Sequence, residues 1–323
     1  MRFDEFYGQS AVVRRLRAQI HDGAIVHAFL FTGPRGCGKK TLARLCAQAW
    51  LCAGADQPCG ECGPCKRVQA GSHPDYIEVK TTKTEIGVED ARKLIEQLAV
   101  RPYEGSRRSV LILSPINKNA QNALLKTLEE PPDGTAFFIT SDQTAQLLPT
   151  VLSRMSIVRL GALDLQQCTR ALTDRGIDPE RAQLLSALGG GVLGRALELE
   201  NDAAYFAVRE KAFELLEPLA PAQLPDKLMQ VKTYNRQQAV ALLSCICEVL
   251  ADLMRVKSGG SVQAVDQLTW LHSAAASLDE RVLCALSDSA LESIRRLGRY
   301  VPVQSAMESF LFTLVKETKG WQL

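Results

Sequence analysis

The sequence is poor in aromatic residues, in histidine and in net charge. Aromatic side chains make up 6% of its 323 residues, only 4 histidines occur, and 38 basic residues against 36 acidic ones give a formal net charge of +2. This balance excludes a chain whose overall electrostatic field draws it onto nucleic acid. Any contact with DNA must therefore be local or shared with other chains.

Long apolar runs are missing as well. No uninterrupted apolar stretch approaches the roughly 20 residues that a membrane helix requires, and residues 1–9 have no apolar core flanked by basic residues. We therefore expect a cytoplasmic chain without membrane contact. Hydrophobic residues at 46% and charged residues at 23% are typical of a globular protein, and the length predicts two or three domains.

Short apolar runs alternate with helical patterns from residue 22 to about residue 159. Parallel strands buried on both faces form continuous apolar runs, so this alternation predicts an α/β domain with a parallel sheet. The expected strands are Ala28–Thr32, Tyr76–Val79, Ser109–Leu113, Ala136–Thr140 and Ser156–Leu160. The helices expected between them include Lys40–Leu51, Val88–Val100 and Ala120–Glu130.

After residue 160 the strand patterns stop and the periodicity is helical to the end of the sequence. Shorter helices are predicted at Leu165–Arg175, Pro179–Leu188 and, beyond three consecutive glycines, Val192–Asn201. Longer amphipathic helices are predicted at Gln237–Lys257 and Asp279–Tyr300. Their broad apolar faces must be buried against each other or against helices of a partner.

A phosphate-binding loop follows the first expected strand. The residues Gly33-Pro34-Arg35-Gly36-Cys37-Gly38-Lys39 open the next helix. Glycines let backbone N–H groups turn toward an anion, the helix N-terminus adds its positive end, and Lys39 supplies a charge for the β and γ phosphates. Strand, loop and helix in this order indicate a nucleotide-binding ancestry rather than an ordinary glycine-rich turn.

The loop lacks the groups that phosphoryl transfer requires. A hydroxyl that ligates Mg²⁺ should follow the lysine, but Lys40 stands there, and Thr41 is turned by about 100° around the helix. A carboxylate should end the strand Ser109–Leu113, yet no acidic residue occurs between Glu104 and Glu129. We expect the site to hold a nucleotide or another phosphate without hydrolysing it, or to stand empty.

Four of the ten cysteines are clustered in an insertion after the expected helix Lys40–Leu51. They are Cys52, Cys59, Cys62 and Cys65. Four thiolates in a reduced compartment fit structural tetrahedral zinc, which leaves no open position for chemistry. An iron–sulfur cluster is the alternative, although nothing else in the chain indicates electron transfer. His73 is a further candidate ligand, and a histidine that caps a turn is the simpler interpretation.

Together these features resemble one family, the clamp-loader subunits of bacterial DNA polymerase III. The resemblance covers nearly the whole chain and rests on five motifs: Phe6-Tyr7-Gly8-Gln9, the phosphate loop, the cysteine insertion ending in His73-Pro74-Asp75, the helix Asn122–Pro132, and Leu148–Arg154. The phosphate loop alone is shared with many ATPases, whereas the helix ending in Glu129-Glu130-Pro131-Pro132 is specific to these loaders.

The resemblance implies a fold of the class α/β plus all-α, in three parts. A RecA-like AAA+ domain with a parallel sheet would span residues 1–160 and carry the zinc insertion at about residues 52–65. A small helical lid would span residues 161–204, and a helical collar domain that joins a five-subunit ring would span residues 205–323.

The resemblance also implies roles for single residues. In the family, the arginine of a serine-arginine-cysteine motif touches the γ-phosphate held by the neighbouring subunit. Here the motif is Ser153-Arg154-Met155, so the arginine is kept, and a guanidinium can stabilise phosphate charge in trans. The family's second sensor maps onto Arg195, which is only structural if no nucleotide binds. A degenerate nucleotide site would comprise Gly33, Gly36, Gly38, Lys39, Lys40, Thr41 and Arg195.

These departures from the motor subunits are similar to the delta-prime type, which lends its arginine to a motor subunit. The resemblance then implies a hetero-pentamer with gamma/tau motor subunits and delta, which loads the sliding clamp onto primed DNA. Its cofactors would be structural zinc and, weakly or not at all, ATP or ADP. The alternative within the family is an ATP-hydrolysing gamma/tau-type motor subunit.

A third hypothesis is a zinc-module protein that binds nucleic acid by itself. Its contacts would come from the basic groups Arg14-Arg15-Arg17 and Arg107-Arg108. No stacking aromatics are interleaved with these arginines, so we expect them to be solvated surface. This hypothesis predicts DNA affinity that falls steeply with salt.

Overall fold

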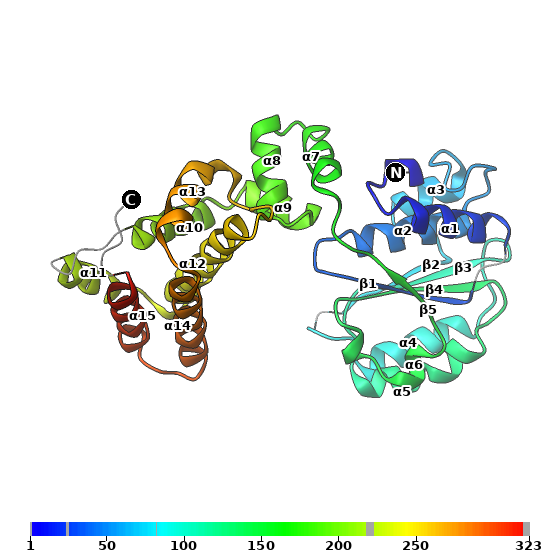
Figure 1. The fold of residues 1–323 in the computed structure, drawn as a ribbon. Helices are drawn as coiled ribbons and strands as arrows, with labels where there is room; N and C mark the ends of the chain where they lie inside the picture. The colour runs from blue at the N-terminus through cyan, green and yellow to red at the C-terminus, as the bar shows by residue number, and fades with distance from the viewer. Residues whose placement is uncertain (1, 24–25, 82, 218–222, 319–323) are drawn as a thin grey trace. The chain divides into compact units, whose positions relative to one another are not determined.

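The computed structural model describes residues 2–23, 26–81, 83–217 and 223–318 (Figure 1). The chain divides into two compact units, Met1–Gly176 with Gly191–Arg195 and Ile177–Gly190 with Ala196–Leu323. The first unit contains the sheet, and the second is helical.

The first unit is built on a five-stranded sheet with the order β2-β3-β4-β1-β5, in which all neighbouring strands are parallel. The strands are β1 (Ala28–Thr32), β2 (Tyr76–Val79), β3 (Arg108–Ile112), β4 (Thr135–Ser141) and β5 (Ser156–Arg159). Each expected strand is confirmed to within one residue at either end. The fold class predicted from the sequence is therefore confirmed for this unit.

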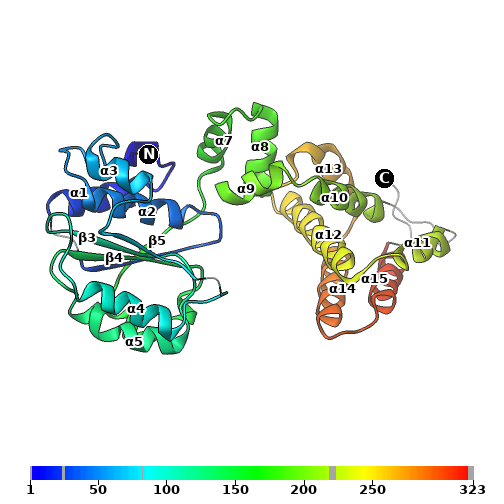
Figure 2. The same cartoon turned by 180° about the vertical axis from the view of Figure 1, so that it is seen from behind.

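Helices cover both faces of this sheet, as Figures 1 and 2 show. One layer contains α1 (Ser10–His21), α2 (Lys39–Leu51) and α3 (Gly63–Gln69), and the other contains α4 (Val88–Leu98), α5 (Lys118–Glu129) and α6 (Pro149–Leu152). Phe29 and Phe31 of β1 belong to the core on the α1 and α2 side, whereas Ala28 and Leu30 belong to the core on the α4 and α5 side. Burial on both faces explains why the strand is continuously apolar.

The strand order determines which loops meet. Because β1 lies between β4 and β5 and all three run parallel, the loops that follow them leave the sheet at the same edge. In open parallel sheets, ligands bind outside the carboxyl ends of the strands. The strand order thus places the phosphate loop, which follows β1, beside the residues that follow β4.

Two short helices complete this unit. Helix η1 (Phe3–Glu5) precedes α1, and η2 (Thr144–Gln146) follows β4.

The second unit contains helices only, among the residues described. They are α8 (Pro179–Leu188), α10 (Ala203–Leu216), α11 (Leu224–Val231), α12 (Arg236–Lys257), η4 (Val265–Gln267), α13 (Leu268–Ser277), α14 (Glu280–Gly298) and α15 (Val303–Glu317). Helix α7 (Leu165–Thr173) belongs to the first unit, and α9 (Leu193–Glu200) crosses from the first unit into the second. The helical periodicity predicted for this half of the sequence is confirmed.

Helix α12 is the centre of the second unit's core. Asn235 caps it, since its side chain accepts a hydrogen bond from the Gln238 N–H and the Gln238 Oε1 accepts one from the Asn235 N–H. Its residues Leu243, Ile246 and Leu250 are fully buried, with helices α10, α13, α14 and α15 contributing the rest of one continuous core. The amphipathic stripe therefore faces the unit's own helices.

The predicted division into three domains stays a prediction. The boundary between the two units falls after Gly176, inside the segment 161–204 that was expected to form a lid.

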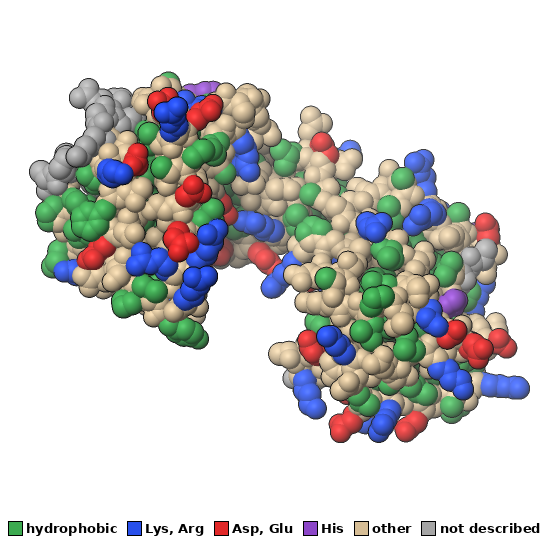
Figure 3. All heavy atoms as spheres, turned by 60° about the horizontal axis from the view of Figure 1, so that its bottom comes forward, with side chains coloured by type: hydrophobic (Ala, Val, Ile, Leu, Met, Phe, Trp, Pro, Cys, Tyr) green, Lys and Arg blue, Asp and Glu red, His purple; other side chains and the backbone are tan. Residues whose placement is uncertain are grey.

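Among the residues described, no helix combines the length and apolar character that crossing a membrane requires. On the face drawn in Figure 3, acidic and basic side chains are interspersed over both units.

Candidate nucleotide site, surface arginine and metal centre

The phosphate loop connects β1 to α2 in a conformation that its glycines make possible. Gly33 has φ +149°, and Gly36 and Gly38 have φ +85° and +93°, all in the region that side chains disfavour. A Cβ atom on Gly33 would lie 2.1 Å from the carbonyl oxygen of Leu160. The position therefore requires glycine for two reasons: the turn itself, and the close approach of Leu160 at the end of the neighbouring strand β5.

The start of α9 packs directly on this loop. The Gly194 N–H donates to the Gly36 carbonyl at 3.0 Å, and a Cβ atom on Gly194 would lie 2.6 Å from the Gly36 Cα. A Cβ atom on Gly36 would approach the Arg195 nitrogen to 3.0 Å. The structure thus places Arg195, the residue expected as a second sensor, next to the loop.

Lys39 uses all of its hydrogen-bond donors within the chain. Its ammonium group donates to the carbonyl oxygens of Gly33 at 2.8 Å and Pro34 at 2.7 Å, and it forms an ion pair with Asp142 at 2.8 Å. An ammonium group has three N–H donors, and three oxygens surround this one. Only 5% of Lys39 is exposed. A phosphate would have to displace the Asp142 carboxylate to reach this charge.

The remaining residues expected at the nucleotide site do not form a magnesium site. Lys40 and Thr41 are both exposed in the first turn of α2. Beyond β3, the side chain of Asn117 accepts a hydrogen bond from the Ala120 N–H and caps α5. Among the described residues, the carboxylate next to the loop is Asp142, which Lys39 already neutralises.

Asp142 is a functional residue that the sequence analysis missed. It follows β4 directly, and the strand order brings the end of β4 next to the phosphate loop. The sequence motif predicts a carboxylate at the end of the strand at residues 109–113, whereas the structure places Asp142 next to Lys39. An acidic residue immediately after a buried strand was the available signal.

Arg154 lies on a different part of the same unit, after α6. Its Nη1 donates to the Thr150 carbonyl at 2.8 Å, and its Nη2 forms an ion pair with Glu129 at 2.9 Å. The Arg154 side chain retains 30% of its exposure. The guanidinium thus reaches the surface, although it is folded against residues of its own chain.

Gln121 of α5 determines where the segment leading to Arg154 runs. It is 1% exposed, its amide nitrogen donates to the carbonyls of Ile116 and Gln146, and its amide oxygen accepts from the Leu148 N–H at 2.7 Å. Every one of these groups is buried or partly buried, so an unpaired partner would be costly. Gln121 therefore fastens the start of α6 to α5.

The four cysteines of the insertion lie close enough to share one ion. Their sulfur atoms are all within 4.8 Å of one another, and the sulfur of Cys52 lies 3.6 Å from that of Cys59 and 3.8 Å from that of Cys62. Tetrahedral zinc with Zn–S bonds of about 2.3 Å places its sulfurs about 3.8 Å apart. The set therefore fits a structural zinc ion.

Backbone N–H groups surround the sulfur atoms, as thiolate ligands require. The sulfur of Cys52 accepts from Gly54 and Cys59, and a hydrogen bond from the Cys62 N–H lowers the pKa of the Cys59 thiol to about 6. Burial raises the pKa of the Cys52 and Cys65 thiols. A bound dication would remove those two protons, because metal coordination deprotonates thiols.

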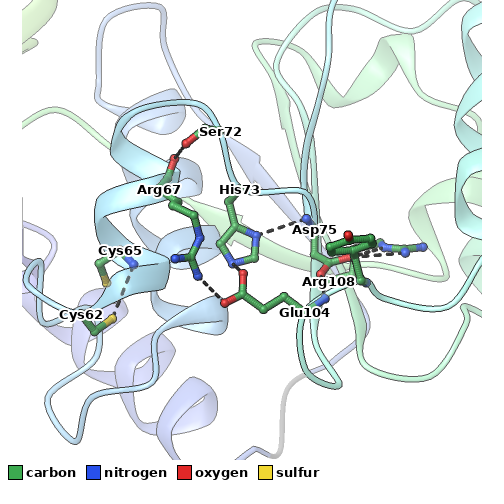
Figure 4. A network of polar contacts seen from close by, with 9 residues as sticks. Cys62, Cys65, Arg67, Ser72, His73, Asp75, Glu104 and Arg108 are labelled. Carbon is green, nitrogen blue, oxygen red and sulfur yellow. Dashed lines mark hydrogen bonds and ion pairs between the residues drawn. The ribbon is translucent and has the colours of Figure 1, made fainter.

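His73 lies outside the cysteine set. Its Nδ1 accepts a hydrogen bond from the Asp75 N–H at 3.1 Å, so Nε2 carries the proton and faces a Glu104 carboxylate oxygen at 3.6 Å (Figure 4). Burial lowers the pKa of the His73 ring. The contact of Nδ1 with the Asp75 N–H caps a turn, as the simpler interpretation of this histidine predicts.

A buried ion pair connects the end of the insertion to the sheet. The Asp75 carboxylate is 1% exposed, accepts from the backbone N–H groups of Tyr103 at 2.9 Å and Glu104 at 2.7 Å, and pairs with Arg108 at 3.4 Å (Figure 4). Arg108 is 4% exposed and also donates to the Val100 carbonyl. Asp75 therefore joins β2, β3 and the segment after α4.

The expectation that Arg107-Arg108 forms a solvated face was wrong. Arg108 is buried because its guanidinium compensates Asp75, and Arg107 stacks 4.3 Å above the ring of Trp50. Arg14 and Arg15 are exposed as predicted, whereas Arg17 pairs with Asp4 and Asp56. Arg17, Arg107 and Arg108 thus make contacts within the domain, whereas Arg14 and Arg15 present their charge to solvent.

Comparisons with known proteins match this chain to subunits of DNA polymerase III. The family model described as "DNA polymerase III, delta subunit" matches residues 8–164. The delta-prime subunit of Bacillus subtilis is 27% identical over 95% of this chain and 96% of that protein. The delta-prime subunit of Pseudomonas aeruginosa is 36% identical over 59% of this chain and 60% of that protein.

Two further findings bound these matches. The chain spans about half the length, or less, of the DNA polymerase III tau relatives that it also matches. Among solved structures, a gamma subunit-related protein of Thermotoga maritima aligns with 94% of this chain at 14% identity and a TM-score of 0.47, which is too low to add to the sequence matches.

A phosphate loop between β1 and α2, on a parallel sheet with helices on both faces, defines an α/β domain of the phosphate-loop class. In sequence the chain is similar to DNA polymerase III subunits of the delta-prime type. The resemblance inferred from the five sequence motifs is confirmed.

The cysteine cluster generates a first prediction. The purified chain should contain about one zinc ion, measured by elemental analysis, and Cys65→Ser should lose it. Removal of the metal should lower the melting temperature of the sheet unit by roughly 5–10 °C, the shift that a loss of about 2–3 kcal/mol produces in a domain of this size. Cys284→Ser, at an exposed cysteine, serves as the control. Iron with visible absorbance would contradict zinc.

The buried carboxylate generates a second prediction. Asp75→Ala leaves the Arg108 guanidinium and two backbone N–H groups without acceptors, so it should lower the free energy of unfolding by about 3–5 kcal/mol. Urea denaturation followed by circular dichroism measures this. Asp133→Ala, at an exposed acidic residue, should change stability by less than about 0.5 kcal/mol. Equal effects of the two substitutions would refute the role of Asp75.

Proposed function

We propose that this chain is a non-hydrolysing subunit of a DNA polymerase III clamp loader, the machine that loads the sliding clamp onto primed DNA. Gamma/tau-type motor subunits and a delta subunit would be its partners in a hetero-pentamer, and its contacts with clamp and DNA would be made through that complex. Cytoplasmic localisation follows from this role. The relatives named delta-prime support the proposal.

The observation that carries the proposal is the state of the nucleotide site. The lysine that should meet the β and γ phosphates is saturated by Gly33, Pro34 and Asp142. The position after it is a second lysine, and β3, which a carboxylate should follow, is followed by Leu113 and Ser114. Phosphoryl transfer depends on metal charge and an oriented water, for which these residues offer no carboxylate.

Arg154 would supply the chain's contribution to hydrolysis in a neighbour. Its guanidinium lies at the surface, and a planar cation placed on a γ-phosphate stabilises the charge that develops as the phosphoryl group leaves. Gln121 would keep the segment before it in place. Because Lys39 is already paired with Asp142 and two loop carbonyls, Arg195 and the loop glycines would have a structural role in this chain.

The cysteine set would hold zinc for stability and not for chemistry. Four protein sulfurs complete a tetrahedral shell, so no position is left for water or substrate. Cys52 and Cys59 begin the site directly after α2, the helix that the phosphate loop opens. The metal would thus support the domain that carries Arg154 without contacting nucleotide.

The trans role of Arg154 gives a third prediction. In a loader reconstituted with its ATPase subunits, Arg154→Ala should reduce turnover at the one motor site that it serves by about 10³-fold or more. Total DNA-stimulated turnover should fall by that site's share, while the melting temperature of the isolated chain stays unchanged. Arg159→Ala, at an exposed arginine of β5, is the matched control. Unchanged turnover with Arg154→Ala would refute the trans role.

The Lys39–Asp142 pair gives a fourth prediction. Asp142→Asn removes the charge that competes with phosphate, so binding of a fluorescent ATP analogue to the purified chain should strengthen by about 3–10-fold, as loss of a partly exposed ion pair of about 1 kcal/mol implies. Asp133→Asn should have no effect. ATP turnover by the wild-type chain that Lys39→Ala abolishes would defeat this proposal and favour a gamma/tau-type motor subunit.

A further inference from the structure

The guanidinium of Arg154 is held by a carboxylate of its own chain. Its Nη2 donates to Glu129 Oε2 at 2.9 Å, and the two residues come from separate elements, since Glu129 is the last residue of α5 and Arg154 lies just beyond α6. Both residues belong to the first unit. The side chains are 30% and 57% exposed, so an incoming group can reach the pair.

The remaining donors of Arg154 are unequally used. Its Nη1 donates to the Thr150 carbonyl at 2.8 Å, whereas Nε is buried and has no hydrogen-bond partner among the described residues. Nε and Nη2 form one edge of the guanidinium, and such an edge can grip two phosphate oxygens with parallel N–H groups. In this structure Glu129 occupies the Nη2 half of that edge, and the Nε half has no acceptor.

A hollow lies beside the Arg154–Glu129 pair. A hollow of about 480 Å³ is lined by Glu129, Ser153 and Arg154 together with His27. The Nε2 atom of His27 is a second buried polar atom without a partner in the described chain. Both nitrogen atoms are covered, so the Arg154 side chain has to leave Glu129 before its Nε–H group can donate to a phosphate.

The Glu129 carboxylate binds the Arg154 guanidinium only weakly. It lies at the carboxyl end of α5, where the helix dipole disfavours negative charge, and a half-exposed ion pair contributes little to stability. A triphosphate carries more negative charge than a carboxylate and offers more oxygens. The ion pair is therefore strong enough to favour the position of Arg154 against Glu129, and weak enough for a phosphate to replace the carboxylate.

We propose that the ion pair with Glu129 holds Arg154 in a resting position, the parked state. Arg154 would reach a neighbour's γ-phosphate by exchanging the Glu129 carboxylate for phosphate oxygens. The inference rests on the proposed trans role of Arg154 and adds its regulation. Glu129 is a positioning residue that acts through Arg154. In the parked state the arginine is neutralised and turned toward its own chain, and in the engaged state Nε and Nη2 together donate to the phosphate.

The test uses the reconstituted loader with its ATPase subunits, with and without primed DNA. Glu129→Gln keeps the size of the side chain and removes its charge, so ATP turnover without DNA should rise about 1.5- to 5-fold at the motor site that Arg154 serves, the factor to which the usual strength of such an ion pair converts, and total basal turnover should rise by that site's share. The ratio of DNA-stimulated to basal turnover should fall accordingly. The adjacent exposed Glu130, changed to Gln, is the matched control and should leave both rates unchanged.

A double variant separates parking from a structural role. Combined with Arg154→Ala, Glu129→Gln should no longer change turnover, because its effect passes through the arginine. A rise that persists without Arg154, or a fall in basal turnover with Glu129→Gln alone, would overturn the parking role. Unchanged turnover with Glu129→Gln, when Arg154→Ala reduces it, would overturn parking and leave the trans role intact. If Arg154→Ala itself has no effect, both proposals fail.

Discussion

The state of the nucleotide site depends on the ammonium group of Lys39. Three oxygens of its own chain surround it, two from the loop that a triphosphate would occupy and one from the residue after β4. The loop keeps the backbone shape of a phosphate site because Gly33 and Gly36 allow it, while its central charge is satisfied internally. The loop geometry thus also serves packing, because the same glycines let Leu160 and Gly194 approach the loop closely.

The same arrangement, a cation held by a nearby carboxylate, recurs at two other places with different consequences. Arg108 and Asp75 are almost completely buried, so that pair determines where β2, β3 and the loop before them lie. Arg154 and Glu129 are half-exposed, so that pair can open at low cost. Burial decides whether such a pair is a structural joint or a reversible contact.

The sequence predicted the sheet well because continuous apolar runs such as Ala28–Thr32 are unambiguous when helices cover both faces. It also predicted the four-cysteine set, whose spacing is local. It did not predict the partners of Lys39, Arg154 and Arg108. Those depend on the strand order and on how α5 and α6 pack, which bring together residues about 25 to 100 positions apart. The short helix α3 was missed because its seven residues are too few to show a period.

The insertion ends where the edge of the sheet begins, since His73 and Asp75 immediately precede β2. Strand β2 has a neighbour on one side only, and an unprotected sheet edge is a template for pairing between chains. Loss of the ion from the cysteine set would therefore loosen the outermost strand and bare the hydrogen-bonding groups of β3. On the proposed role of the cysteine set, a shortage of zinc would threaten the solubility of this chain by way of its outermost strand.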